Sequence, residues 1–346
     1  MKVGFSYWGF CEDYNESEVV FTPDGGRFTR PIFARELFRR GYSIVALQQQ
    51  RESNPLLFLQ YDSQGFPELD CIFIEWRWST YKNDVNHKDY VADGYEPDLD
   101  RQTAIMDHYN GKCPIVVWDT DLKVTETDKR RWDAVWAEPT LRPKNGSFSL
   151  LYFSDYKMRL PIVVPKNRYI YIGSNYERYD SVDKYYYNIG KTLNDFDVEL
   201  EFYGNWLYKS VERPEQEEMV NKYSKYIKFH ERNKFMEGMR LLNDSICTTH
   251  IVKNIYYENG LITPRFFESL SFGTPGLIPV EFPVALYGKR WSVDENNVVD
   301  KIMALSRLNT VERKNVIINQ VQSMLEILPQ THINNFIDKV ETMWKL

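Results

Sequence analysis

The chain has 346 residues, of which 43% are hydrophobic and 15% aromatic, and its formal net charge at pH 7 is −6. This composition is too apolar for a disordered chain, and the length fits two domains of ordinary size. A mildly acidic chain is not expected to bind polyanions over its whole surface, although a local basic patch is compatible with it.

The sequence has no apolar run long enough to span a membrane, so we expect no membrane partner. It begins with the strand-like "MKVGFSYWGF", which has no signal-peptide pattern. The four cysteines are scattered and form no CxxC pair, which is typical of reduced thiols in a cytoplasmic protein. The five histidines lack the spacing of metal ligands, so we predict no protein-bound metal.

The first half of the sequence alternates apolar strand patterns with amphipathic helix patterns. Strand patterns occupy residues 2–9, 43–48, 71–76, 114–121 and 134–139. Helix patterns occupy residues 30–40 and 99–109, each closed by a glycine. Apolar strands that are separated by helices indicate a parallel sheet covered on both faces.

The alternation begins again after a hinge predicted at residues 160–168. Strand patterns then occupy residues 168–175, 198–206, 245–252 and 276–280. Helix patterns occupy residues 183–195, the segment from Thr263 to Gly273, and three final segments, the last at about 333–345. The sequence therefore predicts an α/β protein with two Rossmann-like, doubly wound domains whose sheets face a central cleft. Neither half contains GxGxxG, which argues against a dinucleotide-dependent enzyme.

The segment "TPRFFESLSFGTPGLIPV" places two opposite charges near the start of a helix. Thr263 can cap this helix and Pro264 suits its first turn. Arg265 and Glu268 share a helix face, where an arginine favours a phosphate and a carboxylate can accept hydrogen bonds from a ribose diol. The alternative is an intrahelical salt bridge on a solvated face.

The strand pattern at 114–121 ends in "VVWDTDLK", which contains Asp119 and Asp121. Functional side chains of open α/β sheets gather at the carboxyl ends of strands, and a carboxylate there can act as a general base. The alternative for either aspartate is a cap on the turn that follows.

Two strand ends of the second half carry glycine and polar residues. Gly173 and Ser174 in "GSNYERYD" allow a close approach of the backbone, and Arg178 can reach a phosphate. The alternative is an ordinary strand-to-helix loop. Gly204 and Asn205 in "FYGNW" indicate, taken alone, only a turn.

The stretch "FIEWRWSTYKND" combines aromatic and basic residues after the strand pattern at 71–76. Trp76, Arg77, Trp78 and Lys82 can stack on bases and contact phosphates. The alternative is a packed aromatic pair beside a surface arginine.

Taken in order, "DTDLK", "GSNYER", "EFYGN" and "ITPRFFE" resemble the motifs of the phage DNA β-glucosyltransferases, which glucosylate 5-hydroxymethylcytosine in DNA. The resemblance spans nearly the whole chain and implies the GT-B fold of two Rossmann-like domains. It implies an acceptor-binding domain at 1–162, a nucleotide-sugar domain at 163–330, and a C-terminal helix at 331–346 that crosses back to the first domain. The location it implies is the host cytoplasm, if a phage encodes the chain.

The resemblance also implies roles for individual residues. Asp121 is the catalytic base. The donor-binding residues are Gly173, Ser174, Arg178, Gly204, Asn205, Arg265 and Glu268. The residues that contact the DNA acceptor are Trp76, Arg77, Trp78 and Lys82. A divalent cation, where one takes part, would sit on the diphosphate and be held by no cluster of protein ligands.

The function that follows is transfer of a sugar from a UDP-sugar, by resemblance UDP-glucose, to the hydroxymethyl group of a modified pyrimidine in double-stranded DNA. The expected enzyme is a monomer that flips the target base out of the helix. One alternative is a GT-B glycosyltransferase that acts on a polysaccharide or a small molecule. Another is a non-catalytic protein that binds a nucleotide sugar or a nucleic acid.

Overall fold

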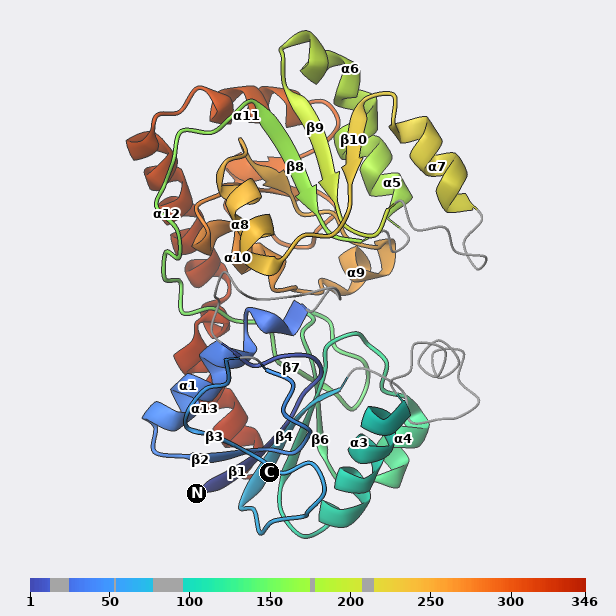
Figure 1. The fold of residues 1–346 in the computed structure, drawn as a ribbon, viewed down its shortest axis with the longest axis vertical. Coiled ribbons are helices and arrows are strands. Elements are labelled where there is room, and N and C mark those ends of the chain that lie inside the picture. The colour runs from blue at the N-terminus through green and yellow to red at the C-terminus, as the bar shows by residue number, and fades with distance from the viewer. Residues whose placement is uncertain (13–24, 53, 77–95, 175–177, 207–214) are drawn as a thin grey trace. The chain divides into compact units, whose positions relative to one another are not determined.

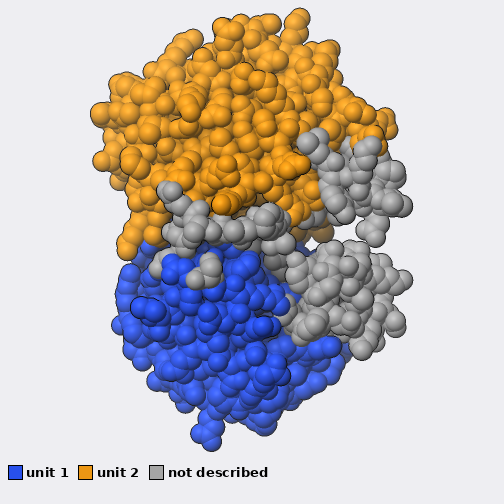
Figure 2. Space-filling model, in the orientation of Figure 1, with its two compact units in different colours: residues 1–13, 24–155, 330–346 blue, residues 14–23, 156–329 orange. Residues whose placement is uncertain are grey.

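The computed structural model describes residues 1–12, 25–52, 54–76, 96–174, 178–206 and 215–346 (Figure 1). The chain forms two compact units, which Figure 2 shows in different colours. Unit 1 comprises Met1–Asp13, Asp24–Asp155 and Gln330–Leu346, and unit 2 comprises Tyr14–Pro23 and Tyr156–Pro329.

Unit 1 is built on a seven-stranded sheet with the order β3-β2-β1-β4-β5-β6-β7, in which every pairing is parallel. Its strands are β1 (Lys2–Ser6), β2 (Ser43–Ala46), β3 (Leu59–Tyr61), β4 (Cys71–Trp76), β5 (Ile115–Asp119), β6 (Val135–Glu138) and β7 (Phe148–Ser149). The strand order reverses at β1, which lies between β2 and β4. Open parallel sheets bind their ligands at the carboxyl ends of the strands beside such a reversal.

The central strand β4 is buried on both faces because its side chains alternate between two helical layers. On one face Phe73 packs against Phe33 of α1 and Phe336 of α13. On the other face Trp76 lies in a core cluster that includes Met106 of α3. These helices are α1 (Arg30–Arg39), α3 (Glu96–Tyr109), α4 (Glu126–Arg131) and α13 (Ile333–Met343).

Helix α13 is the last helix of the sequence, yet it packs on unit 1. Its Phe336 contacts Phe33 with ring centroids 5.9 Å apart, and the Trp344 indole donates to the Ile72 carbonyl at 2.9 Å. An ion pair between Arg40 and Asp338 adds a contact at 2.6 Å. The C-terminal segment is therefore an integral part of the unit 1 core.

Unit 2 contains two three-stranded parallel sheets, with the orders β10-β9-β8 and β11-β12-β13. Their strands are β8 (Arg168–Ile172), β9 (Glu199–Tyr203), β10 (Ile227–His230), β11 (Thr248–Thr249), β12 (Gly276–Pro279) and β13 (Ser292–Val293). The Ile246 amide donates to the Arg168 carbonyl at 2.8 Å, so the chain that leads into β11 runs beside β8.

The helices of unit 2 are α5 (Tyr179–Val182), α6 (Asn188–Asp195), α7 (Glu215–Tyr223), α8 (Phe235–Asn243), α9 (Asn254–Asn259), α10 (Arg265–Ser271), α11 (Val298–Ser306) and α12 (Thr310–Ile327). A π-helical turn (Asp183–Tyr187) joins α5 to α6. No helix in the described part of the chain is long and apolar enough to cross a membrane.

Arg313 of α12 is buried in the core of unit 2 and connects several loops there. Its guanidinium donates to the carbonyls of Gly273, Ile246, Asn243 and Ser245 at 2.8–3.2 Å. Burial lowers the pKa of Arg313 to about 10, which leaves it charged at neutral pH. One buried cation thus satisfies four carbonyl groups where α10 and α8 end.

Several elements differ from the patterns that predicted them. The strand predicted at 245–252 contains only the two-residue β11, although the amides on either side of it still bond to strands, that of Ile246 to Arg168 of β8 and that of His250 to Leu277 of β12. The helix expected to be capped by Thr263 begins at Arg265 with Pro264 in the cap position and no side-chain cap. Four short strands, β3, β7, β10 and β13, have no counterpart in the sequence patterns because they are too short to show a period.

Candidate functional site

The guanidinium of Arg265 lies directly over the turn that follows β8. It donates to the Tyr171 hydroxyl at 2.6 Å and lies over the Tyr171 ring, 5.3 Å from the centroid. Gly173 has a φ of +152°, and a Cβ added there would overlap the Arg265 guanidinium. Only glycine therefore fits at this position while Arg265 keeps its place.

The turn after β9 packs against the turn after β8. A Cβ added at Gly204 would overlap the Gly173 carbonyl oxygen, and the same oxygen accepts a 2.6 Å hydrogen bond from the Trp206 indole. The Asn205 amide faces the Ser174 hydroxyl at 3.4 Å. The two turns form one surface of closely packed backbone.

The structure brings together the donor-binding residues that were predicted on three separate segments. The Arg178 guanidinium donates to the Ser174 carbonyl, which joins Arg178 to the same turn. Glu268 is buried one turn along α10 from Arg265. Because α10 has only seven residues, the positive charge at this point comes chiefly from Arg265 and not from the helix dipole.

The buried side chain of His250 contacts α10 through a hydrogen bond. Its Nε2 lies 3.2 Å from the Ser269 hydroxyl and 2.8 Å from the Tyr287 hydroxyl, which donates to the Phe266 carbonyl at 2.6 Å. Burial, with a further contribution from the Arg265 charge, lowers the pKa of His250 to about 3. The imidazole is therefore neutral at physiological pH. Sequence reasoning missed this residue because its partners are distant along the chain.

In unit 1 the two aspartates of "DTD" have different environments. Asp119, the last residue of β5, is 1% exposed, and its two oxygens accept the amides of Lys123 and Val124, both at 2.7 Å. Burial raises the pKa of Asp119 to about 7. Asp121 lies within the turn that Asp119 ties down and is partly exposed. Of the two aspartates, only Asp121 is partly exposed to solvent.

A buried polar cluster accompanies these aspartates at the carboxyl edge of the sheet. Arg30 of α1 forms a two-pronged ion pair with Glu75 of β4, with N–O distances of 2.5 and 2.9 Å. Tyr152 is buried beside them, and burial followed by the negative charges of Glu75 and Asp121 raises its pKa well above the usual value. Tyr152 is thus a neutral hydroxyl. Sequence reasoning missed these residues, although a glutamate inside the apolar "CIFIEW" was a signal.

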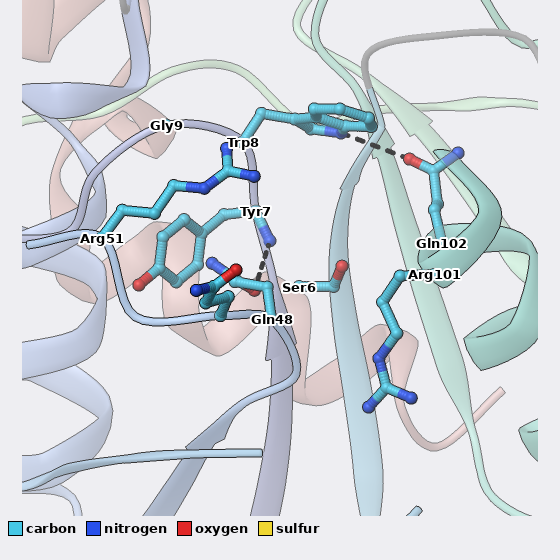
Figure 3. Close-up of a pocket in the computed structure, with 9 residues that line it drawn as sticks. Ser6, Tyr7, Trp8, Gly9, Gln48, Arg51, Arg101 and Gln102 are labelled. Carbon is cyan, nitrogen blue, oxygen red and sulfur yellow. Dashed lines mark hydrogen bonds between the residues drawn. The ribbon is translucent and has the colours of Figure 1, made fainter. Parts of the chain in front are cut away.

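A small pocket with a cavity volume of about 20 Å³ lies where β1 and β2 end (Figure 3). The Trp8 indole donates to Gln102 of α3 at 3.3 Å, and the Tyr7 amide donates to the Gln48 side chain at the same distance. Within the described residues, the buried Nε2 of Gln48 has no hydrogen-bond partner. Arg101 turns its guanidinium away from Trp8, toward the carbonyls of neighbouring loops. The pocket is therefore about the size of one water molecule.

The structure corrects the role predicted for Trp76. Its ring is fully buried and packs edge-on against Trp132 and Trp136, so it has no face to offer a base. The alternating side chains of β4 turn it toward the α3 layer, and this makes it a core residue. Arg77, Trp78 and Lys82 lie outside the described residues.

No group of three or more histidine, cysteine, aspartate or glutamate side chains in the described ranges is arranged to hold a metal ion.

No family model matches the sequence, and no curated protein matches it either. Solved structures do match its fold. The T4 phage beta-glucosyltransferase has a TM-score of 0.63 at 14% identity, covering 100% of both chains, and one structure of that protein contains UDP and Mn²⁺. An alpha-glucosyltransferase solved with UDP and a 13-mer DNA containing an HMU base has a TM-score of 0.66 at 9% identity, again over 100% of both chains.

A third similar structure is an O-GlcNAc transferase mutant from Thermobaculum terrenum, with a TM-score of 0.52 and 12% identity over 99% of this chain and 67% of that one. The expected fold class is confirmed: the chain has the GT-B glycosyltransferase fold and resembles phage DNA glucosyltransferases over its full length. At 9–14% sequence identity, this structural similarity shows the fold alone.

The neutral state of His250 predicts how unit 2 responds to acid. Because the folded pKa is about 3 and the unfolded value is about 6.5, the unfolded chain takes up a proton that the folded chain excludes. The free energy of unfolding should therefore fall as the pH drops below about 6.5, by up to about 1.4 kcal/mol per pH unit.

His250→Gln keeps a polar group near the Nε2 position and does not titrate, so it should flatten this slope. Urea unfolding between pH 4.5 and 7, with amide exchange to follow unit 2 separately, measures it. Equal slopes for the wild type and the variant would contradict the prediction.

Proposed function

We propose that the protein is a glycosyltransferase that moves a sugar from a UDP-sugar to the hydroxymethyl group of a modified pyrimidine in duplex DNA. The observation that carries this proposal is the seating of Arg265 on Tyr171 and Gly173, beside the turn at Gly204. Such a seat fixes a cation beside two closely packed glycine turns, and a fixed guanidinium is a suitable partner for a diphosphate. The GT-B fold supports the same assignment.

In the donor site we assign Arg265 to the diphosphate and Glu268 to the ribose hydroxyls. Arg178 is held at the turn after β8 and can add a second positive charge. As the leaving UDP gains negative charge, fixed cations stabilise it without reorganisation. Gly173, Ser174, Gly204 and Asn205 let the backbone approach the phosphates. A divalent cation, if bound, would sit on the diphosphate and add charge there.

Asp121 is the proposed general base. It takes the proton of the acceptor hydroxyl while that oxygen forms a bond to the anomeric carbon. The bond from the anomeric carbon to the UDP oxygen breaks, and its electron pair leaves with UDP. This single displacement inverts the anomeric centre and needs no covalent enzyme intermediate. The partial exposure of Asp121, against the burial of Asp119, supports this choice of base.

The proposed acceptor is DNA that carries a hydroxymethylated pyrimidine. The alpha-glucosyltransferase of similar fold has been solved in complex with DNA that contains an HMU base, and this supports a DNA acceptor. A stacked base cannot reach a carboxylate at a sheet edge, so the enzyme must flip the base out, at a cost of a few kcal/mol. We assign Arg77, Trp78 and Lys82, which follow β4 in the sequence, to the DNA contact. Trp76 is not part of it, because it is buried.

The alternative is a small-molecule or polysaccharide acceptor with the same donor chemistry. Two observations support this alternative acceptor. The chain also resembles the fold of an O-GlcNAc transferase, and its net charge of −6 is unfavourable for binding DNA. A non-catalytic binding protein is the remaining alternative, and slow hydrolysis of UDP-glucose without acceptor would exclude it.

Arg265→Ala should weaken UDP binding by about 1–3 kcal/mol, the scale of a lost charge-assisted hydrogen bond, and Glu268→Ala should do the same. Calorimetry with UDP measures both. Arg290→Ala is the matched control, because Arg290 also lies over an aromatic ring of unit 2, that of Trp291, but is exposed. Wild-type UDP affinity in both site variants would contradict the assignment of Arg265 and Glu268 to the donor. The intrahelical salt bridge would then be the better interpretation of the pair.

Asp121→Asn keeps the shape of the side chain and removes its basicity. Turnover of UDP-glucose with duplex DNA containing 5-hydroxymethylcytosine should fall about a hundredfold or more, while UDP affinity stays unchanged. Asp133→Asn, at an exposed aspartate of the same unit, serves as the control. Undiminished turnover in Asp121→Asn would leave this residue without a catalytic role.

Arg77→Ala and Trp78→Ala should reduce transfer to hydroxymethylated duplex DNA far more than they reduce UDP affinity. DNA binding should also weaken steeply with added salt, because a local patch contacts the phosphates. Arg130→Ala removes an exposed basic residue elsewhere in unit 1 and controls for general loss of charge. Transfer to a free hydroxymethylated nucleoside at the rate seen with duplex DNA would instead favour the small-molecule acceptor.

A further inference from the structure

The turn that carries Asp121 joins β5 to α4 and is tied at almost every residue. Before Asp121, the Thr120 amide and hydroxyl both face the Trp76 carbonyl at 3.2 Å. After it, the Asp119 carboxylate accepts the amides of Lys123 and Val124 at 2.7 Å. The side chain of Asp121 therefore projects from a segment whose backbone is fixed on both sides.

The same turn contains an unusual backbone conformation. Leu122 has a φ of +59°, in the left-handed region that a residue with a Cβ seldom adopts. Its carbonyl accepts a 3.0 Å hydrogen bond from the Lys144 ammonium. Backbone strain of this kind persists only where surrounding contacts hold it, and it recurs at functional sites.

The backbone of Lys144 is also held by a hydrogen bond. Its backbone amide donates to the buried Glu138 carboxylate at 3.1 Å, at the end of β6 beside β5. Two buried carboxylates at the ends of neighbouring strands, Asp119 and Glu138, thus each secure one turn, and Lys144 connects the two turns.

We propose that Asp119 and Lys144 are positioning residues for Asp121, which hold the left-handed bend at Leu122 and so set the direction of the Asp121 carboxylate. The inference rests on the proposed function of Asp121. Asp119 acts through the backbone and does not touch substrate, because both of its oxygens already accept amides and its side chain is buried. A displaced base loses reactivity steeply, since proton transfer depends on hydrogen-bond reach.

Asp119→Asn and Lys144→Met test the proposal by two readouts. In Asp119→Asn, the new amide group faces one of the two N–H donors and loses that bond. Turnover with UDP-glucose and hydroxymethylcytosine duplex DNA should fall about tenfold or more, and in Lys144→Met about threefold or more, while UDP affinity stays at the wild-type value. Amide exchange of the peptide covering residues 119–126 should become faster in both variants.

Lys144→Arg keeps a donor for the Leu122 carbonyl and should restore most of the turnover. Lys129→Met is the matched control, since the Lys129 ammonium donates to a carbonyl of the same turn as Lys144, that of Asn145, and pairs with Glu126 at the start of α4 rather than with the Leu122 carbonyl. Lys144 is exposed, so its variant remains informative even if Asp119→Asn fails to fold.

Wild-type exchange at 119–126 in both variants, or faster exchange with wild-type turnover, would overturn the proposal. So would a loss in Asp119→Asn as deep as in Asp121→Asn with unchanged exchange, because Asp119 would then be the base itself. The proposed function fails separately: wild-type turnover in Asp121→Asn removes the base whatever the exchange data show. A loss in Asp121→Asn without a loss in either positioning variant defeats the inference alone.

Discussion

The contact of Arg265 with the backbone at Gly173 is the constraint on which the unit 2 site depends. The guanidinium can lie over Tyr171 only because residue 173 has no Cβ, and the turn after β9 can approach only because residue 204 has none. Two glycines in the turns after separate strands thus allow an arginine from a third segment to pack against the backbone. The glycines are needed for steric reasons. A Cβ at residue 173 would overlap the Arg265 guanidinium, and a Cβ at residue 204 would overlap the Gly173 carbonyl oxygen.

The elements beneath this contact hold it from several directions. His250 connects Ser269 of α10 to Tyr287, and Arg313 binds the carbonyls where α10 and α8 end. One of these groups is a buried neutral imidazole and the other a buried cation. Each is satisfied by hydrogen bonds, as buried polar groups must be if they are not to destabilise the fold. The position of Arg265 is therefore set by core packing more than by the short helix that carries it.

Unit 1 uses a different device at the carboxyl edge of its sheet. It buries charge: the Arg30–Glu75 pair, the Asp119 carboxylate and the Glu138 carboxylate all lie at or near strand ends. Removing such groups from water is unfavourable, and a core of apolar side chains would be at least as stable. Their presence at the edge where open sheets bind ligands, beside the partly exposed Asp121, agrees better with positioning of a reactive group than with stability alone.

The sequence by itself determined the alternation of strands and helices, the α/β class, and the short motifs at strand ends, because these depend on local periodicity and on turn residues. Strand β4 matched its predicted bounds, as its apolar pattern is strong and local. Only the tertiary structure decided which side of that strand each residue faces, so that Trp76 enters the core. Only it assigned Asp119 to backbone amides and brought His250, Tyr287 and Ser269 together. The physical reason is that these roles arise from contacts between residues far apart in sequence, and a sequence pattern records spacing along the chain but not the approach of distant segments.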